Sequence, residues 1–200
     1  MGISLRQFEQ MKDRLGGKST TISDFANQRA NDSTPQIILG IDPSLRGTGF
    51  GIIETSNPLP RTLAHGTIAC PKIWERSRCF VKISQTLREE IRKYRPALCV
   101  VEGLFYAQNL KTALIMGEAR GAALAAVAEA GIEIFEIAPR KVKQAIVGYG
   151  AAQKSAVAKM VQRMLDLPKP PAPDAADALA LALAYAQQNR RAYFPAAKKI

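Results

Sequence analysis

The sequence predicts an α/β fold in which helices flank a mixed five-stranded sheet. The chain opens with three β-rich runs separated only by short turns, which is typical of an antiparallel meander. After the third run, helical stretches alternate with short apolar runs, as they do in β–α–β units with parallel strands. The 200 residues are 47% hydrophobic, so one domain with a full core accounts for them.

The meander is predicted from three runs. Residues 37–41 are apolar and end at Asp42-Pro43, and residues 49–54 follow a turn at 44–47. Residues 62–70 supply the third strand, although Gly66 interrupts its pattern. The first strand therefore delivers Asp42 at its carboxyl end.

An amphipathic helix and a buried strand come next. Within residues 74–94, apolar side chains recur at intervals of three and four with basic residues between them, which predicts a helix with a basic outer face. Pro96 stops this helix. Residues 97–101 then form an apolar run that we expect to be a fully buried strand, ending at Glu102.

The remaining elements are separated by glycines and prolines. A helix rich in small residues covers 110–130, and Gly117 and Gly121 share one of its faces, so we expect another element to pack closely there. Four prolines stiffen the linker at 168–173. The other predicted elements are a strand at 132–137 and helices at 140–147, 154–165 and 174–188.

Three segments are expected along the chain. Residues 36–189 are expected to form the domain and residues 190–200 a frayed basic tail, while residues 1–35 are a polar extension for which disorder is one expectation. The extension lacks the apolar core of a signal peptide. Since no apolar run reaches the length of a membrane span, we expect no membrane segment. The three cysteines form no C-x-x-C pair, which favours buried thiols in a reducing, cytoplasmic compartment.

The charge balance favours a polyanionic partner. Lys and Arg number 28 against 17 Asp and Glu, which gives a formal charge of +11 and a pI near 9.8. Nucleic acid is the first expectation and an acidic membrane surface the second. The single histidine leaves little material for a zinc site or a Ser-His-Asp triad. Any catalysis should therefore depend on carboxylates.

Four carboxylates are candidates for that chemistry. Asp174 and Asp177 share one helical face, where like charges repel unless a cation intervenes. Asp42 and Glu102 end buried strands, at the sheet edge where functional groups collect. Each also has a structural explanation: helix-terminus stabilisation for the Asp pair, a turn for Asp42, and a solvated strand end for Glu102. Together they predict Mg²⁺ or Mn²⁺, two ions roughly 4 Å apart that activate water and stabilise a leaving 3′ oxygen.

Four blocks of residues, in order over about residues 36–188, carry a resemblance. They are Ile-Leu-Gly-Ile-Asp-Pro (38–43) with Thr-Gly-Phe-Gly (48–51); Val101-Glu102 with Phe105, Asn109, Ala113-Leu114 and Gly-Glu-Ala-Arg-Gly (117–121); Val142-Lys143-Gln144 with Val147-Gly148 and Lys154-Ser155; and Asp174-Ala-Ala-Asp177-Ala-Leu. These blocks resemble the RuvC family of Holliday junction resolvases. The resemblance implies a ribonuclease H-like fold and a homodimeric, Mg²⁺-dependent endonuclease that nicks opposed strands of a four-way DNA junction in recombination and repair.

The resemblance also implies roles for individual residues. Asp42, Glu102, Asp174 and Asp177 match the metal-binding catalytic acids. Phe105 matches an aromatic residue that stacks on bases near the junction centre, although a core phenylalanine is the alternative. Lys143 and Lys154 match basic residues near the scissile phosphates, with solvated lysines as the alternative, and Arg120 and Arg140 could contact the DNA backbone. Ser44 replaces the family's usual glycine, and residues 1–35 have no counterpart; they could bind a partner such as the branch-migration proteins RuvA and RuvB.

Three other functions fit parts of the pattern. A non-catalytic junction-binding protein would share the basic surface, but would not need all four acids. An actin-like ATPase has a similar phosphate-cradling hairpin, but needs two related domains. A ribonuclease H-like nuclease acting on RNA or flaps could use the same carboxylates. Substrate choice is set by shape and dimer geometry.

Overall fold

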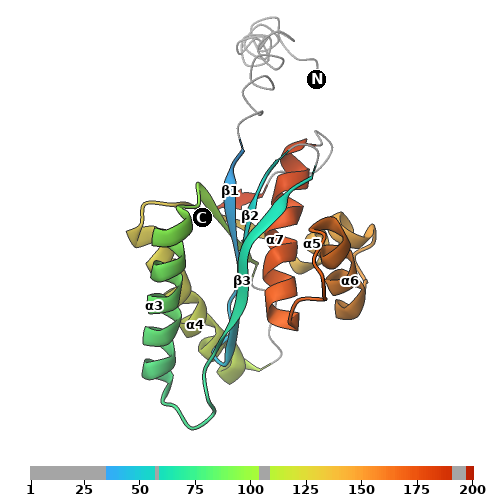
Figure 1. The fold of residues 1–200 in the computed structure, drawn as a ribbon. Coiled ribbons are helices and arrows are strands. Elements are labelled where there is room, and N and C mark those ends of the chain that lie inside the picture. The colour runs from blue at the N-terminus through green and yellow to red at the C-terminus, as the bar shows by residue number, and fades with distance from the viewer. Residues whose placement is uncertain (1–34, 57–58, 104–108, 191–196) are drawn as a thin grey trace, which may run out of the picture. The chain divides into compact units, whose positions relative to one another are not determined.

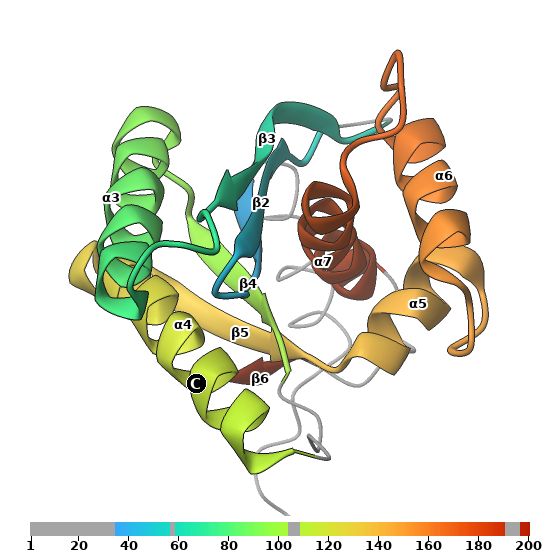
Figure 2. The same ribbon diagram turned by 90° about the horizontal axis from the view of Figure 1, so that it is seen from below.

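The computed structural model describes residues 35–56, 59–103, 109–190 and 197–200. Residues 36–200 form one compact unit in which helices cover both faces of a mixed sheet (Figures 1 and 2). This architecture confirms the predicted fold class. Residues 1–34 of the predicted extension and Phe105 lie outside the described residues.

The sheet has the strand order β3-β2-β1-β4-β5-β6. The predicted meander is present: β1 pairs antiparallel with β2, and β2 with β3. β4 lies parallel to β1, and β5 parallel to β4, as expected for the alternating part of the chain. The strands span Ile37–Asp42 (β1), Gly47–Glu54 (β2), Arg61–Ala69 (β3), Leu98–Glu102 (β4), Glu133–Ile137 (β5) and Lys198–Lys199 (β6).

The helices form two layers, one on each face of the sheet (Figure 2). α3 and α4 cover one face, while α7 lies against the other with α5 and α6 outside it. Alternate residues of each strand serve the two cores: Leu39 and Ile41 point to the α3/α4 side and Ile38 to the α7 side. The helices are Arg76–Tyr94 (α3), Leu110–Glu129 (α4), Pro139–Val147 (α5), Lys154–Met164 (α6) and Pro173–Arg190 (α7).

The sixth strand is a difference from the sequence prediction. The end of the expected frayed tail pairs antiparallel with β5, Glu136 opposite Lys198, and the Ile200 amide donates to the Ile134 carbonyl. A salt bridge between Lys199 and Glu133 adds to this pairing. Two exposed lysines carry no apolar alternation, so the sequence pattern gave no indication of this strand.

A second difference concerns α4. A Cβ atom at Gly117 or Gly121 would meet nothing within 4 Å in the described part of the chain, so the element expected to pack there is absent from it. Leu110 and Leu114 on the same face are 75% and 60% exposed. This face is therefore apolar, smooth and uncovered.

Two simpler predictions concern the cysteines and membrane segments. Cys70, Cys79 and Cys99 are all buried and unpaired, as expected. Among the described helices, none combines the length and apolar character required to cross a membrane.

Candidate active site

The position of α7 is set by glycines on the sheet beneath it. Gly47, Gly49 and Gly51 alternate along β2 and so share a face, and Gly40 lies beside Gly51 on β1. A Cβ atom at Gly49 would overlap the Asp174 carbonyl oxygen, and one at Gly40 would overlap the Ala178 carbonyl oxygen. At Gly51 a Cβ would lie 2.7 Å from the Leu179 side chain. The α7 backbone therefore rests directly on the strands.

This close approach places the start of α7 beside the carboxyl end of β1. Asp42 pairs with Gly49, so it lies on the face and at the level where α7 begins. Glu102 ends β4, the parallel neighbour of β1, after Ile41 has paired with Val101. The two strand-end acids are thus neighbours, as the sequence predicted.

Asp174 and Asp177 approach the same place from α7. The Asp174 carboxylate lies over Gly47, where a Cβ would be 2.8 Å from its Oδ2 atom. It occupies the first turn of α7, where the helix dipole also favours a carboxylate. Asp177 accepts a hydrogen bond of 2.7 Å from Nζ of Lys154, the first residue of α6. Lys154 is thereby brought into the acidic cluster.

The electrostatics show that these acids act on one another. Burial, together with the charges of Glu102, Asp177 and Asp174, raises the pKa of Asp42 to about 7, although the charge of Lys154 opposes this rise. Burial and Asp177 also raise the pKa of Glu102, against the charge of Lys154 and a hydrogen bond with Asp42. The hydrogen bond to Asp177 raises the pKa of Lys154. The cluster therefore carries more negative charge than its surroundings stabilise.

A divalent cation fits this donor set. Carboxylate oxygens are the ligands that Mg²⁺ and Mn²⁺ prefer. The raised pKa values of Asp42 and Glu102 reflect burial first and repulsion between the acids second, and a bound cation would relieve that repulsion. In the described residues, however, no three His, Cys, Asp or Glu side chains already surround a common point as metal ligands would. The Lys154 ammonium on Asp177 and the Asp42–Glu102 hydrogen bond occupy positions that a cation would take over.

Arg120 differs from its prediction as a DNA contact. Its side chain is only 7% exposed, and Nη2 forms a 2.6 Å ion pair with Oε2 of Glu136. Nη1 donates to the backbone carbonyl oxygen of Glu102. An internal guanidinium with both ends engaged is not available to the DNA backbone. Instead, Arg120 ties α4 to β5 and to the end of β4.

The other predicted basic residues lie on α5. Lys143 is half-buried and close enough to Glu102 for its positive charge to lower the pKa of that carboxyl. Arg140 is exposed, with its side chain against Gly150. The structure thus brings Lys143 and Lys154 to the acidic cluster.

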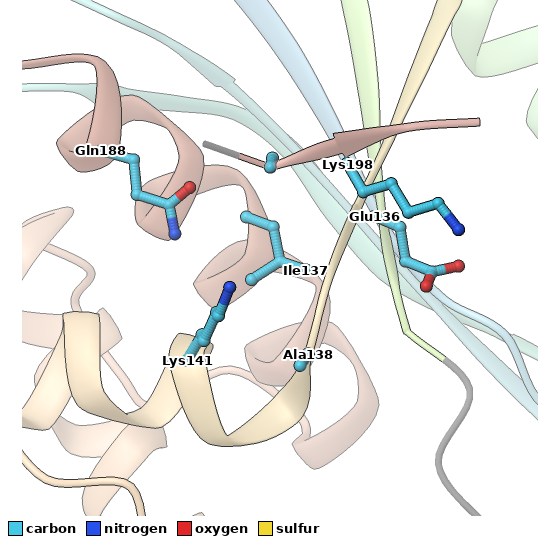
Figure 3. Close-up of a pocket in the computed structure, with 7 residues that line it drawn as sticks. Glu136, Ile137, Ala138, Lys141, Gln188 and Lys198 are labelled. Atoms are coloured by element: carbon cyan, nitrogen blue, oxygen red, sulfur yellow. The ribbon is translucent and has the colours of Figure 1, made fainter. Parts of the chain in front are cut away.

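A small pocket at the β5–β6 edge is separate from these acids. It has a volume of about 160 Å³, and Figure 3 shows the Glu136 and Lys198 side chains extending beside each other there. Gln188 of α7 and Lys141 of α5 also line it. Because its carboxylate, Glu136, is already paired with Arg120, the pocket offers no free acid for metal chemistry.

Sequence reasoning missed Glu136 and the glycine row. Glu136 is a charged residue inside the apolar run Ile-Phe-Glu-Ile, and that interruption could have indicated a buried partner. The glycines at 47, 49 and 51 have the two-residue period of one strand face, which could have indicated a close approach of another backbone.

An α/β domain with this strand order, and with acids gathered at the ends of its central strands, belongs to the ribonuclease H-like class of nucleases. Residues 38–185 match the family model described as crossover junction endodeoxyribonuclease RuvC. The chain belongs to the RuvC family. This membership confirms the predicted function, an endodeoxyribonuclease of Holliday junctions that acts in recombination, and implies a divalent metal cofactor.

Curated relatives and solved structures agree with this assignment. Crossover junction endodeoxyribonuclease RuvC of Rubrobacter xylanophilus is 43% identical over 158 residues, which cover 78% of this chain and 88% of the relative. The protein of the same name from Akkermansia muciniphila is 43% identical over 148 residues, 74% of this chain and 89% of the relative. T. thermophilus RuvC in complex with a Holliday junction substrate superposes with a TM-score of 0.76 at 32% identity, covering 82% of this chain and 99% of that one.

Proposed function

We propose that this chain resolves four-way DNA junctions by symmetric, Mg²⁺-dependent hydrolysis, with Asp42, Glu102, Asp174 and Asp177 as its catalytic acids. The observation that carries the proposal is the convergence of these acids, through α7 and the ends of β1 and β4, around one basic side chain, Lys154. Four interacting carboxylates in a protein of net charge +11 are costly unless they bind cations.

The acids, the two lysines and Arg120 have different roles in the proposed hydrolysis. Hydrolysis joins a water oxygen to phosphorus and releases the 3′ oxygen as a hydroxyl. Two Mg²⁺ ions, held by the four acids, would supply a nucleophile at neutral pH and stabilise charge on the leaving oxygen. Lys154 and Lys143 place positive charge where the phosphate would approach. Arg120 keeps the end of β4, and with it Glu102, in position.

Symmetric cleavage requires two active sites, and α4 offers a face for a second copy. Leu110, Leu114, Gly117 and Gly121 form a stripe that nothing in the described chain covers. Open glycines let two helices approach closely, and the exposed leucines supply apolar area. We expect Leu114→Asp to convert a dimer into a monomer in sedimentation equilibrium, with an unchanged circular dichroism spectrum.

The proposal extends to location and partners. The three buried thiols suit a reducing, cytoplasmic compartment, where the chromosome and its recombination intermediates are found in bacteria. Cooperation with the branch-migration proteins RuvA and RuvB belongs to the same proposal. A pull-down with purified RuvA and RuvB, on junction DNA and without it, would test that part.

One cleavage assay tests the central claim. The wild type, Asp42→Asn, Asp174→Asn and a surface-acid control, Glu129→Gln, are incubated with end-labelled junction, linear duplex, flap and RNA–DNA hybrid substrates, with Mg²⁺, with Mn²⁺ or with chelator. We expect paired nicks in opposed strands of the junction only, from the wild type and Glu129→Gln and only with metal. Equal cutting of linear duplex or hybrid would overturn the substrate assignment, and wild-type cleavage by Asp174→Asn would remove that residue from the site.

A further inference from the structure

The segment that enters α3, residues 71–78, is an exposed basic protrusion that the site described above does not use. Ile73 is 89% exposed, and every residue of the segment except the half-buried Trp74 is exposed. Three of the eight residues, Lys72, Arg76 and Arg78, are basic, and one, Glu75, is acidic. In the following we call residues 71–78 the α3 entry segment.

Hydrogen bonds hold this segment in a fixed shape. Nη1 of Arg46 donates to the carbonyl oxygens of Pro71 at 2.7 Å and Trp74 at 3.0 Å. The Cys70 amide donates to the Arg46 carbonyl oxygen at 3.0 Å, and the Trp74 amide donates to Pro71. A segment this exposed yet this well tied is preorganised, so little conformational entropy would be lost when it binds a partner.

Arg46 also ties the segment to the active site. It belongs to the turn that follows Asp42, and Thr48 closes that turn through hydrogen bonds with Ser44. Asp42 pairs with Gly49, and Gly49 pairs with Thr67, so the three residues form one row across the sheet. Two strand spacings and three residues along β3 place Cys70 roughly 14 Å from Asp42. In Figure 1 the connection from β3 to α3 lies at the lower end, where α4 and α7 begin.

The charges on the segment are available to an external ligand. Arg76 forms an ion pair of 2.8 Å with Glu118, whereas Lys72 and Arg78 have no ion pair in the described parts of the chain. The Arg78 guanidinium stacks over the Trp74 ring, 4.0 Å from its centroid, which holds that cation in place. One exposed isoleucine offers little apolar area for docking another protein, whereas the cations beside it suit a sugar–phosphate backbone.

We infer that the α3 entry segment binds a duplex arm of the junction beside the cleavage site. Lys72 and Arg78 contact phosphates, and Ile73 contacts the sugars between them. DNA rises 3.4 Å per nucleotide along its helix axis, and successive phosphates of one strand lie further apart than this rise. The roughly 14 Å offset therefore places the contacted phosphates about two to four nucleotides from the scissile one. The inference rests on the proposed function, because it takes the position of the scissile phosphate from the four carboxylates.

A matched pair of double variants tests the assignment. Lys72→Ala/Arg78→Ala removes the two cations of the segment that form no ion pair with the described residues. Arg92→Ala/Lys93→Ala removes two exposed cations from the other end of the same helix, about 25 Å away. Junction affinity is measured against salt concentration in an Asp42→Asn background, which prevents cleavage. The slope of log affinity against log salt concentration, here called the salt slope, becomes shallower by about 1.8 when two phosphate contacts are lost. The difference in affinity between variant and parent should therefore narrow about twelvefold between about 50 and 200 mM salt. We expect this for the first variant only.

A DNA modification gives the position of the contact. Neutral methylphosphonates are placed at the second to fifth phosphates on either side of the cut. Substitutions on one side of the cut should weaken junction binding by the parent protein. The same substitutions should not weaken junction binding by Lys72→Ala/Arg78→Ala any further. Ile73→Glu, at the exposed tip, adds a repulsive charge without removing a core contact and should weaken binding at least as much. Trp74 is the only tryptophan, so its fluorescence should also change when junction DNA is added.

The outcomes separate the inference from the proposed function. If the wild type does not cut junctions with Mg²⁺, the proposed function fails. The α3 entry segment is not the contact if the wild type cuts junctions and both double variants keep the salt slope of the parent. The same conclusion follows if the salt slope falls by the same amount in both double variants. If Lys72→Ala/Arg78→Ala or Ile73→Glu instead becomes monomeric without DNA, the segment belongs to an interface between copies, and the inference is likewise overturned.

Discussion

Replacing Arg120 by methionine should damage both the stability and the activity of the protein. Methionine keeps most of the aliphatic volume but removes the guanidinium that joins Glu136 to the Glu102 carbonyl oxygen. The Glu136 carboxylate would then lose its cation, and the end of β4 would lose its only side-chain donor among the described residues.

The size of the effect follows from burial. Removing one partner of a buried ion pair typically costs about 3–5 kcal/mol, because the other charge stays behind unpaired. The Glu136 side chain is 28% exposed, so water can reach the freed carboxylate and we expect a smaller loss, about 2–3 kcal/mol. For a domain of this size that corresponds to roughly 5–10 °C in Tm. Glu102 would also be free to shift, and misplacement of a catalytic group by about 1 Å can reduce kcat on the order of a hundredfold.

Thermal unfolding and single-turnover cleavage, measured together, test this prediction. Arg88→Met is the control, because it breaks an exposed ion pair between α3 and α4 and should cost less than about 1 kcal/mol. Adding Glu136→Leu to Arg120→Met should restore part of the stability, since it removes the stranded charge, but should not restore kcat. A wild-type Tm for Arg120→Met, or additive losses in the double variant, would refute the reasoning. A loss confined to KM would refute the positioning role.

Further predictions concern the acids and the helix that carries two of them. Gly49→Ala should push the start of α7 away from the sheet and reduce cleavage more than tenfold, at a stability cost of about 1–3 kcal/mol; unchanged cleavage rates would contradict this. Because the folded-state pKa of Asp42, about 7, exceeds its unfolded value of 3.8, folded protein binds the extra proton between these pH values, and metal-free stability should fall as pH rises through them. Without metal at pH 8, Asp42→Asn should therefore have a higher Tm than the wild type. Mg²⁺ should raise the Tm of the wild type more at pH 8 than at pH 5. Equal Tm values in the first comparison, or equal shifts in the second, would contradict the corresponding prediction. Lys154 lowers the pKa of Asp42 and Glu102, so Lys154→Met should move the acidic limb of the pH–rate profile to higher pH, and an unmoved limb would argue against its role among the acids.

Most of the fold was predictable because its elements carry strong local patterns. The meander, the strand before Glu102 and the amphipathic α3 follow from alternation, apolar runs and helical periodicity. β6 was not predictable, because two lysines become a strand only through pairing with β5. For α4 the sequence predicted a face of small residues correctly. It could not show whether the element that packs against this face belongs to the same chain, and no described residue covers it.

The site was predictable to the extent that strand order fixes it. Parallel β1 and β4 place Asp42 beside Glu102, as their strand-end positions suggested. The approach of α7 depends on a tertiary contact across more than 120 residues of chain, and only the glycine row encodes it. Arg120 was misjudged for a related reason: an arginine in a basic protein is expected at the surface, and its burial depends on Glu136 in another element.

The seating of α7 on bare glycines has a consequence for engineering this enzyme. A helix that touches a sheet through side chains can be re-angled by exchanging those side chains, whereas one that rests on backbone has no such adjustable spacer. Libraries aimed at altered activity should therefore leave the glycine row untouched and vary positions of the outer helices α5 and α6 other than Lys143 and Lys154, which lie at the acidic cluster. Directed evolution for thermostability has the same freedom, because substitutions in that outer layer leave the spacing between Asp42 and Asp174 unchanged.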